Sequence, residues 1–181
     1  MEKLLTPRKK VDSPPENPIL GKNSEEIHSD NAQQQATLSL DLCQQAQHTI
    51  RIYSQDLDRA TLDNQDLQIA LSRFVRQSPR AKVQILIIDS TRAVQTGHML
   101  IRLARQLSSY VEIRKVNPLY GKLDSHFISI DGTAFIYREQ AQNWHACINY
   151  NSPTQSRRLD EYFDRAWQSG ESDPNIRSFI I

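Results

Sequence analysis

Six consecutive residues near the middle of the chain, Val83-Gln-Ile-Leu-Ile-Ile88, are apolar at every position but one. A strand with water on one face alternates apolar and polar residues, so a nearly unbroken apolar run is typical of a central strand covered on both faces. Asp89 ends the run, and a polar segment continues to Gly97. The chain must therefore place other layers above and below this strand, which favours an α/β fold.

Segments with helical periodicity occur on both sides of this strand in the sequence. In residues 65–77 the apolar side chains recur at intervals of three and four, and further helices are predicted over about 31–47, 98–108 and 153–168. Other strands are predicted over 50–54, 111–116, 126–130, 134–138 and 146–150, with an Asp-Gly pair at 131–132 that is typical of a type I′ hairpin turn. Strands that alternate with helices predict a three-layer α/β/α domain with a mixed, mostly parallel sheet.

The first 30 residues differ in composition from the rest of the chain. They contain four prolines, Pro7, Pro14, Pro15 and Pro18, and charges of both signs alternate with Ser and Asn. Prolines interrupt helices, and a polar segment of this kind buries too little apolar surface to fold. We therefore predict a disordered polar leader over residues 1–30, followed by one folded domain over residues 31–175.

Charge and cysteine content exclude several classes of protein. The chain has 22 Lys and Arg residues against 21 Asp and Glu residues, which argues against a general nucleic-acid binder. Cys43 and Cys147 are too few for a disulfide framework, and the five histidines lack the spacing of a metal site, so we expect no metal and no cofactor. No apolar run approaches the roughly 20 residues that cross a bilayer, and no signal peptide is evident, so we expect a cytoplasmic protein without a membrane span.

Polar residues follow the predicted parallel strands, at the carboxyl ends where open α/β sheets bind ligands. Asp56 follows the first of these strands, and Asp89 and Arg92 follow the second. His98 begins the next helix, whose N-terminal amides can bind an anion. These four residues are candidates for a binding cleft, but Asp is also a common cap of helices and turns.

A second group of candidates lies around the predicted strand at 126–130. Asp124 and His126 share one face of this segment, and Asp131 follows it. Together with the later strands and the last helix, the segment resembles the phospholipase D superfamily, which carries a His-x-Lys-x-x-x-x-Asp motif on such a strand. On that spacing Asp124 occupies the His position, His126 the Lys position and Asp131 the Asp position. The resemblance covers about residues 35–170 and implies one half-domain of the phospholipase D fold.

In that superfamily the motif histidine attacks a phosphodiester phosphorus and the lysine holds the phosphate. A carboxylate at position 124 repels an anionic substrate, and the Gly-Ser/Thr-x-x-Asn stretch of the superfamily is replaced by Tyr137-Arg-Glu-Gln140. The chain also resembles a bacterial family of degenerate phospholipase-D-like domains, whose function is unknown. These departures favour a catalytically inactive domain, so Asp124, His126 and Asp131 are weak catalytic candidates.

The resemblance therefore implies a binding, interaction or regulatory module. Active members of the superfamily build one site from two motifs, which implies a homodimer; another protein and an anionic or phosphate-containing ligand are the other partners that we expect. Two alternatives stay open. One is an altered phosphodiesterase or nuclease that uses His126. The other is a nucleic-acid-binding domain that uses basic groups such as Arg73, Arg76, Arg80 and Lys82.

Overall fold

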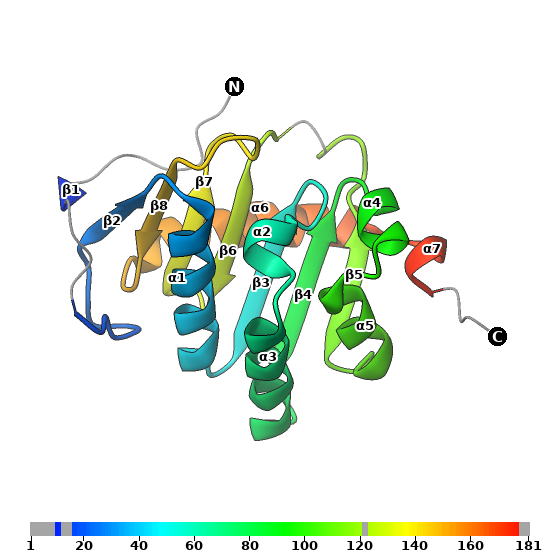
Figure 1. The fold of residues 1–181 in the computed structure, drawn as a ribbon, viewed down its shortest axis with the longest axis horizontal. Helices are drawn as coiled ribbons and strands as arrows, with labels where there is room; N and C mark the ends of the chain where they lie inside the picture. Colours follow the sequence, from blue (N-terminus) through cyan, green and yellow to red (C-terminus); the bar gives the residue numbers. More distant parts are fainter. Residues whose placement is uncertain (1–9, 12–15, 121–122, 178–181) are drawn as a thin grey trace.

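The computed structural model describes residues 10–11, 16–120 and 123–177, and these form a sheet with the strand order β1-β2-β8-β7-β6-β3-β4-β5-β9 (Figure 1). The strands are β1 (Lys10–Val11), β2 (Glu26–Ser29), β3 (Thr49–Ser54), β4 (Lys82–Ile87), β5 (Val111–Lys115), β6 (His126–Ile130), β7 (Ala134–Arg138), β8 (Ala146–Asn149) and β9 (Glu171–Ser172). The helices are α1 (Ala32–Gln45), α2 (Arg59–Leu62), α3 (Gln65–Gln77), α4 (Thr91–Gln95), α5 (Met99–Gln106), α6 (Pro153–Ser169) and α7 (Pro174–Arg177).

Helices cover both faces of this sheet. Figure 1 shows α1, α2, α3 and α5 in front of the sheet and α6 behind it. One apolar core, which includes Leu42, Leu71 and Ile85, lies under the front helices, and a second, which includes Phe127 and Phe163, lies under α6. The predicted three-layer α/β/α fold is thus confirmed. No helix in the described part of the chain is long and apolar enough to cross a membrane.

The prediction of a mostly parallel sheet is wrong. Strands β3, β4 and β5 pair in parallel, as do β1 and β2. The other five pairs of neighbouring strands are antiparallel. Parallel neighbours need a long crossover, whereas β6, β7 and β8 follow one another through connections that contain no helix. Helices therefore separate the parallel strands β3, β4 and β5, whereas none separates β6, β7 and β8.

The predicted hairpin turn between β6 and β7 is confirmed. Asp131 and Gly132 have positive φ angles of 53° and 61°, and the Thr133 N–H donates to the Ile130 carbonyl at 2.9 Å. Positive φ at both central residues is the mark of a type I′ turn. The turn aligns the two strands so that His126, at the start of β6, pairs with Arg138, at the end of β7.

The structure differs from the predicted polar leader at residues 26–29. They form β2, which pairs antiparallel with β8, and Ile27 is 1% exposed opposite Ile148. A single apolar residue between Glu26 and His28 gives no periodic signal, so the sequence did not indicate a strand here. Residues 1–9 and 12–15 of the predicted leader lie outside the described residues.

We expect Ile27→Ala to lower the free energy of unfolding by about 2–4 kcal/mol, because it truncates a side chain in the front core. Ile69→Ala is the matched control, because Ile69 is 57% exposed on α3, and we expect it to change stability by less than about 0.5 kcal/mol. Urea denaturation measures both values. Equal effects of the two substitutions would show that β2 does not belong to the cooperative unit.

Candidate functional site

The carboxyl ends of β3 and β4 lie at the same edge of the sheet as the start of β6 and the end of β7. This arrangement follows from the pairing of β3 with β6 in antiparallel register, in which Tyr53 faces Phe127. We call this side of the sheet the carboxyl edge. It brings His126 and Arg138 close to Asp58, which precedes α2.

Arg138 is the buried positive charge of the carboxyl edge. Its side chain is 2% exposed, and its Nη2 donates to Asp58 Oδ2 at 2.9 Å. The guanidinium carbon lies 4.8 Å from the centroid of the Trp144 ring. Burial lowers the pKa of Arg138, and the Asp58 carboxylate opposes this effect. Among the described residues, no hydrogen-bond acceptor reaches its Nε or Nη1, so two strong donors have no partner there.

His126 lies beside Arg138 on the neighbouring strand. The residue is 3% exposed, and burial together with the positive charge of Arg138 holds its pKa well below the usual 6.5. Its ring is therefore neutral at pH 7, and its Nδ1 has no hydrogen-bond partner within the described ranges. The resemblance places a lysine at position 126, where this chain has the neutral ring of His126. The permanent positive charge beside this position belongs to Arg138 on the neighbouring strand.

The other two motif positions lie at opposite ends of β6. Asp124 precedes the strand at the carboxyl edge, where its carboxylate accepts a hydrogen bond from the Gln55 side chain. Asp131 follows the strand, and its carboxylate accepts three backbone N–H bonds of 2.7–2.8 Å, from Gln47, His48 and Thr49. Asp131 thus stabilises the chain where it enters β3. It lies at the other end of β6 from Asp124 and His126, so the three motif positions do not form one site.

Two of the four predicted cleft residues form a loose ion pair and one caps a helix. Arg92 Nη1 lies 3.9 Å from Asp56 Oδ2, and the two side chains are 71% and 45% exposed. Asp89 accepts hydrogen bonds from the Thr91 hydroxyl at 2.7 Å and from the Thr91 backbone N–H at 2.9 Å, which lower the pKa of its carboxyl. Asp89 therefore stabilises the turn that leads through Ser90 into α4.

His98 caps its own helix. It is fully buried, and its Nδ1 accepts a hydrogen bond from the Leu100 N–H at 3.1 Å. Burial lowers its pKa, and the Asp63 carboxylate, 3.8 Å from Nδ1, opposes this effect. Because the imidazole occupies a backbone donor of the first turn of α5, His98 does not open that helix end to an anion.

The predicted cleft and motif residues do not include Arg138 or Asp58. Arg138 could have been found by pairing the residues on the two sides of the predicted turn at 131–132, because this register places Arg138 opposite His126. Asp58 gave no signal beyond that of a helix cap, and it does cap α2 by accepting from the Ala60 N–H at 3.1 Å.

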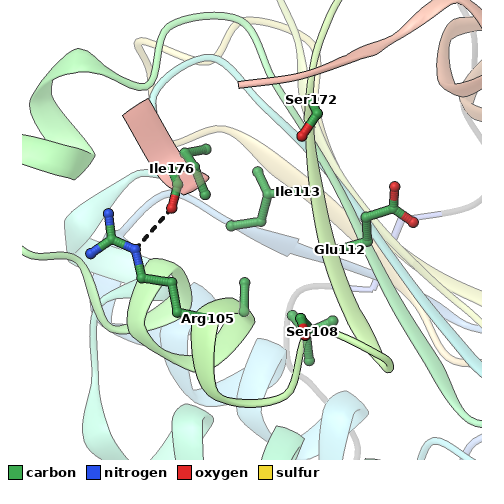
Figure 2. A pocket seen from close by; sticks show the side chains of 8 residues that line it. Arg105, Ser108, Glu112, Ile113, Ser172 and Ile176 are labelled. Atoms are coloured by element: carbon green, nitrogen blue, oxygen red, sulfur yellow. Dashed lines mark hydrogen bonds between the residues drawn. The ribbon is translucent and has the colours of Figure 1, made fainter. Parts of the chain in front are cut away.

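A separate cavity of about 570 Å³ lies at the other end of the sheet, between α5, β5, β9 and α7 (Figure 2). Its walls include Ile113 and Ile176, and Arg105 Nε donates to the Ile176 carbonyl at 2.8 Å. None of the motif residues lines this cavity. The carboxyl edge, where the motif strand meets a buried charge, is therefore the better candidate site.

A family model described as a domain of unknown function, DUF7931, matches residues 31–179. The chain belongs to this family. The match begins one residue before α1, so β2 lies outside it. A search of the curated proteins found no match.

Three solved structures have a similar fold. TrmBL2, an archaeal chromatin protein with a novel mode of DNA binding, is 14% identical with a TM-score of 0.60 over 82% of this chain and 54% of its own. NucT from Helicobacter pylori is 14% identical with a TM-score of 0.57 over 82% of this chain and 100% of its own. A phosphatidylserine synthase of Haemophilus influenzae Rd KW20 is 12% identical with a TM-score of 0.53 over 81% of this chain and 39% of its own. This chain thus spans about half of TrmBL2, and the likenesses support a phospholipase-D-like fold.

We expect His126 to stay neutral in the folded protein while it titrates near pH 6.5 in the unfolded chain. Below pH 6.5 the unfolded state then binds a proton that the folded state does not, so stability falls by up to about 1.4 kcal/mol per pH unit as the pH decreases. His126→Gln removes this contribution and makes the loss of stability between pH 6.5 and pH 5 shallower, whereas His98 retains its own part.

Urea denaturation at several pH values measures this change. The reference for both proteins is their stability at pH 8, where His126 carries no proton in either the folded or the unfolded state. An NMR titration in which folded His126 changes charge near pH 6.5 would contradict the prediction.

Proposed function

We propose that this domain binds a phosphate-containing ligand at the carboxyl edge and does not hydrolyse it. The proposal rests on Arg138, whose buried guanidinium keeps Nε and Nη1 without an acceptor among the described residues. Leaving a buried charged donor without an acceptor is costly, and guanidinium groups are preferred donors to phosphate oxygens. A phosphate group would supply the missing acceptors.

The charges around Arg138 restrict the kind of phosphate ligand. Each of three nearby carboxylates already has a partner: Asp58 with Arg138, Asp56 with Arg92, and Asp124 with Gln55. The three carboxylates outnumber the two guanidinium groups of Arg138 and Arg92, so these groups give the edge no net positive charge and a polyanion is repelled. We therefore expect a ligand that presents a single phosphate group.

The lack of hydrolysis is inferred from the motif positions. The nucleophile position holds Asp124, whose carboxylate cannot replace an imidazole as the nucleophile and accepts a hydrogen bond from Gln55. The phosphate-holding position has the neutral ring of His126, which adds no positive charge for a transition state in which negative charge builds up. Binding by Arg138 without turnover is the outcome that these residues favour.

Fluorescence titration of the full chain tests this proposal, because Trp144 lies against the Arg138 guanidinium. In Trp167→Phe protein Trp144 is the remaining tryptophan, since the chain has two. We expect inorganic phosphate and dimethyl phosphate to change its emission in a saturable manner, whereas chloride at equal ionic strength does not. Arg138→Lys should weaken binding about tenfold or more, because an ammonium lacks the planar set of donors.

Arg59→Lys is the matched control, since Arg59 directly follows Asp58 in the chain but is 51% exposed and pairs with Asp63. We expect it to bind phosphate as the parent does. The Nε–H resonance of Arg138, followed by NMR in the unmodified chain, gives a second readout that does not depend on a variant. Equal affinity of the parent and Arg138→Lys, or an Nε–H resonance that phosphate does not shift, would refute the proposal.

An altered phosphodiesterase is the first alternative, and it depends on the unpartnered Nδ1 of His126 within the described residues. Assays with bis(p-nitrophenyl) phosphate, phospholipid, and single- and double-stranded DNA from pH 5 to pH 9 distinguish it. Our proposal predicts no turnover. A reproducible rate that His126→Ala abolishes in folded protein would establish the alternative.

Nucleic-acid binding is the second alternative, and the likeness to TrmBL2 weighs against our expectation that nucleic acid is not a partner. The observation that favours it is a group of exposed basic residues on α3 and at the start of β4, Arg73, Arg76, Arg80 and Lys82. None of these belongs to the ion pairs found among the described residues.

Fluorescence anisotropy with a labelled DNA duplex separates this alternative from the phosphate site. Phosphate contacts to DNA make the affinity fall steeply with salt, by a slope of about −0.9 for each phosphate neutralised. Binding with such a slope, lost in the double variant Arg73→Glu and Arg76→Glu but kept in Arg138→Lys, would favour the basic surface. We expect no specific DNA affinity in the parent chain at 150 mM salt.

A further inference from the structure

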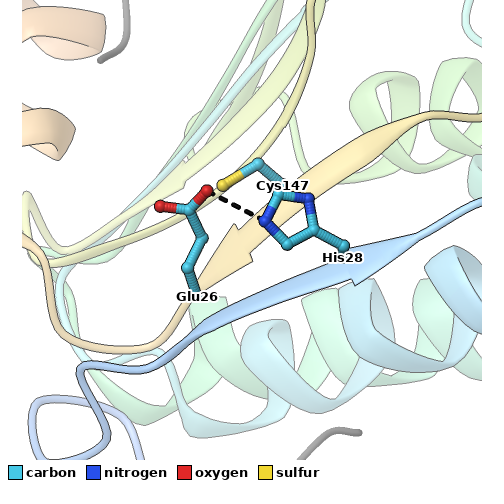
Figure 3. A group of neighbouring side chains, drawn as sticks. All are labelled: Glu26, His28 and Cys147. Carbon is cyan, nitrogen blue, oxygen red and sulfur yellow. Dashed lines mark ion pairs between the residues drawn. The ribbon is translucent and has the colours of Figure 1, made fainter. Parts of the chain in front are cut away.

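Three side chains that can bind a metal converge where β2 pairs with β8. Glu26 and His28 lie on the same face of β2, and His28 is paired directly with Cys147 of β8. One ligand atom from each of the three residues lies within 4.8 Å of the other two. Figure 3 shows the carboxylate, the imidazole and the sulfur turned toward one another.

The contacts within this group already bring the ligand atoms close together. His28 Nε2 lies 3.0 Å from Glu26 Oε1, and the Cys147 thiol is hydrogen-bonded to the Glu26 carboxylate. The Glu26 side chain is 4% exposed, whereas the His28 side chain is 34% exposed. A carboxylate is therefore buried at the inner end of the group, and the imidazole reaches solvent at the outer end.

We propose that Glu26, His28 and Cys147 form a binding site for a zinc ion. A thiolate, an imidazole and a carboxylate are the ligand types that proteins use for Zn²⁺, whereas Mg²⁺ and Ca²⁺ prefer oxygen ligands alone. The ligand atoms need only small side-chain rotations to reach the usual metal–ligand distances of about 2.0–2.3 Å. On binding, the Cys147 thiol releases its proton to solvent, and the Zn–S bond replaces the hydrogen bond to Glu26.

Three protein ligands leave one tetrahedral position, which the exposed side of His28 makes accessible to water. The metal would join β2 to β8 on the face of the sheet opposite Ile27, which is buried in the front core. β2 would then be attached to the sheet by the packing of Ile27 on one face and by the metal on the other. This site is separate from the carboxyl edge and does not depend on the proposed phosphate binding.

Cobalt substitution in the full-length, reduced, metal-free chain tests the proposal. Co²⁺ bound to a thiolate gives a sulfur-to-metal charge-transfer band in the near ultraviolet, so we expect one equivalent of Co²⁺ to produce this band and Zn²⁺ to displace it. Cys147→Ser should abolish the band, and His28→Gln should weaken Co²⁺ binding at least tenfold. Cys43→Ala is the matched cysteine control and should retain both the band and the affinity, because Cys43 lies in the front core.

A second measurement uses the unmodified chain and so does not depend on the folding of a variant. Zn²⁺ should slow alkylation of Cys147 by iodoacetamide in the unmodified chain, as followed by mass spectrometry of the peptide that contains it. Zn²⁺ should also raise the melting temperature of the parent by several degrees and leave that of Cys147→Ser unchanged. A cobalt spectrum without the thiolate band, a band that persists in Cys147→Ser, or alkylation of Cys147 at the same rate with and without Zn²⁺ would overturn the proposal.

Discussion

The Asp131 carboxylate fixes the pairing of β3 with β6, and the carboxyl edge depends on that pairing. Its two oxygens accept N–H bonds from the residues that begin β3, and its own N–H donates to the Thr49 carbonyl at 2.9 Å. Hydrogen bonds to a charged acceptor contribute about 1.5–3 kcal/mol each, more than neutral ones. A group at one end of β6 therefore sets which residues meet at the other end.

The register that follows places Ile130 opposite Ile50 and Phe127 opposite Tyr53. A slip of one residue between β3 and β6 would turn every side chain of β6 to the other face of the sheet and would move Arg138, which is paired with β6, away from Asp58, which follows β3. Asp131, which the resemblance places at the aspartate of the motif, thus has a structural role in this chain.

The sequence predicted the centre of the fold better than its edges, for a physical reason. The apolar run at Val83–Ile88 identified β4 as a central strand, and β4 does lie between β3 and β5. The burial of a segment determines its own pattern of apolar residues, so the pattern can be seen in that segment alone. Pairing between distant segments produces no pattern in either segment, so neither β2 nor the convergence of Glu26 with Cys147 could be predicted.

In the candidate site, too, the positions along one strand could be predicted, whereas the contacts with other segments could not. The spacing around the motif strand predicted where Asp124, His126 and Asp131 lie along β6, because a strand alternates its side chains regularly. It did not predict what surrounds them. Gln55 donates a hydrogen bond to Asp124, and Asp58 accepts one from Arg138. Both contacts depend on the loop after β3, whose path is determined by tertiary packing and not by a periodic sequence pattern.

We propose that the carboxyl edge recognises phosphate without stabilising the transition state for its cleavage. Catalysis requires interactions that are stronger in the transition state than with the bound substrate. Here the positive charge of Arg138 is already balanced by Asp58, and the neighbouring His126 ring is neutral, so little positive charge is left to meet the negative charge that builds up during attack. The N–H groups of Arg138 that have no acceptor among the described residues can donate to a phosphate oxygen in the ground state as well as in the transition state. Uniform binding of this kind gives affinity without rate, which is what our proposal of phosphate binding without hydrolysis expects.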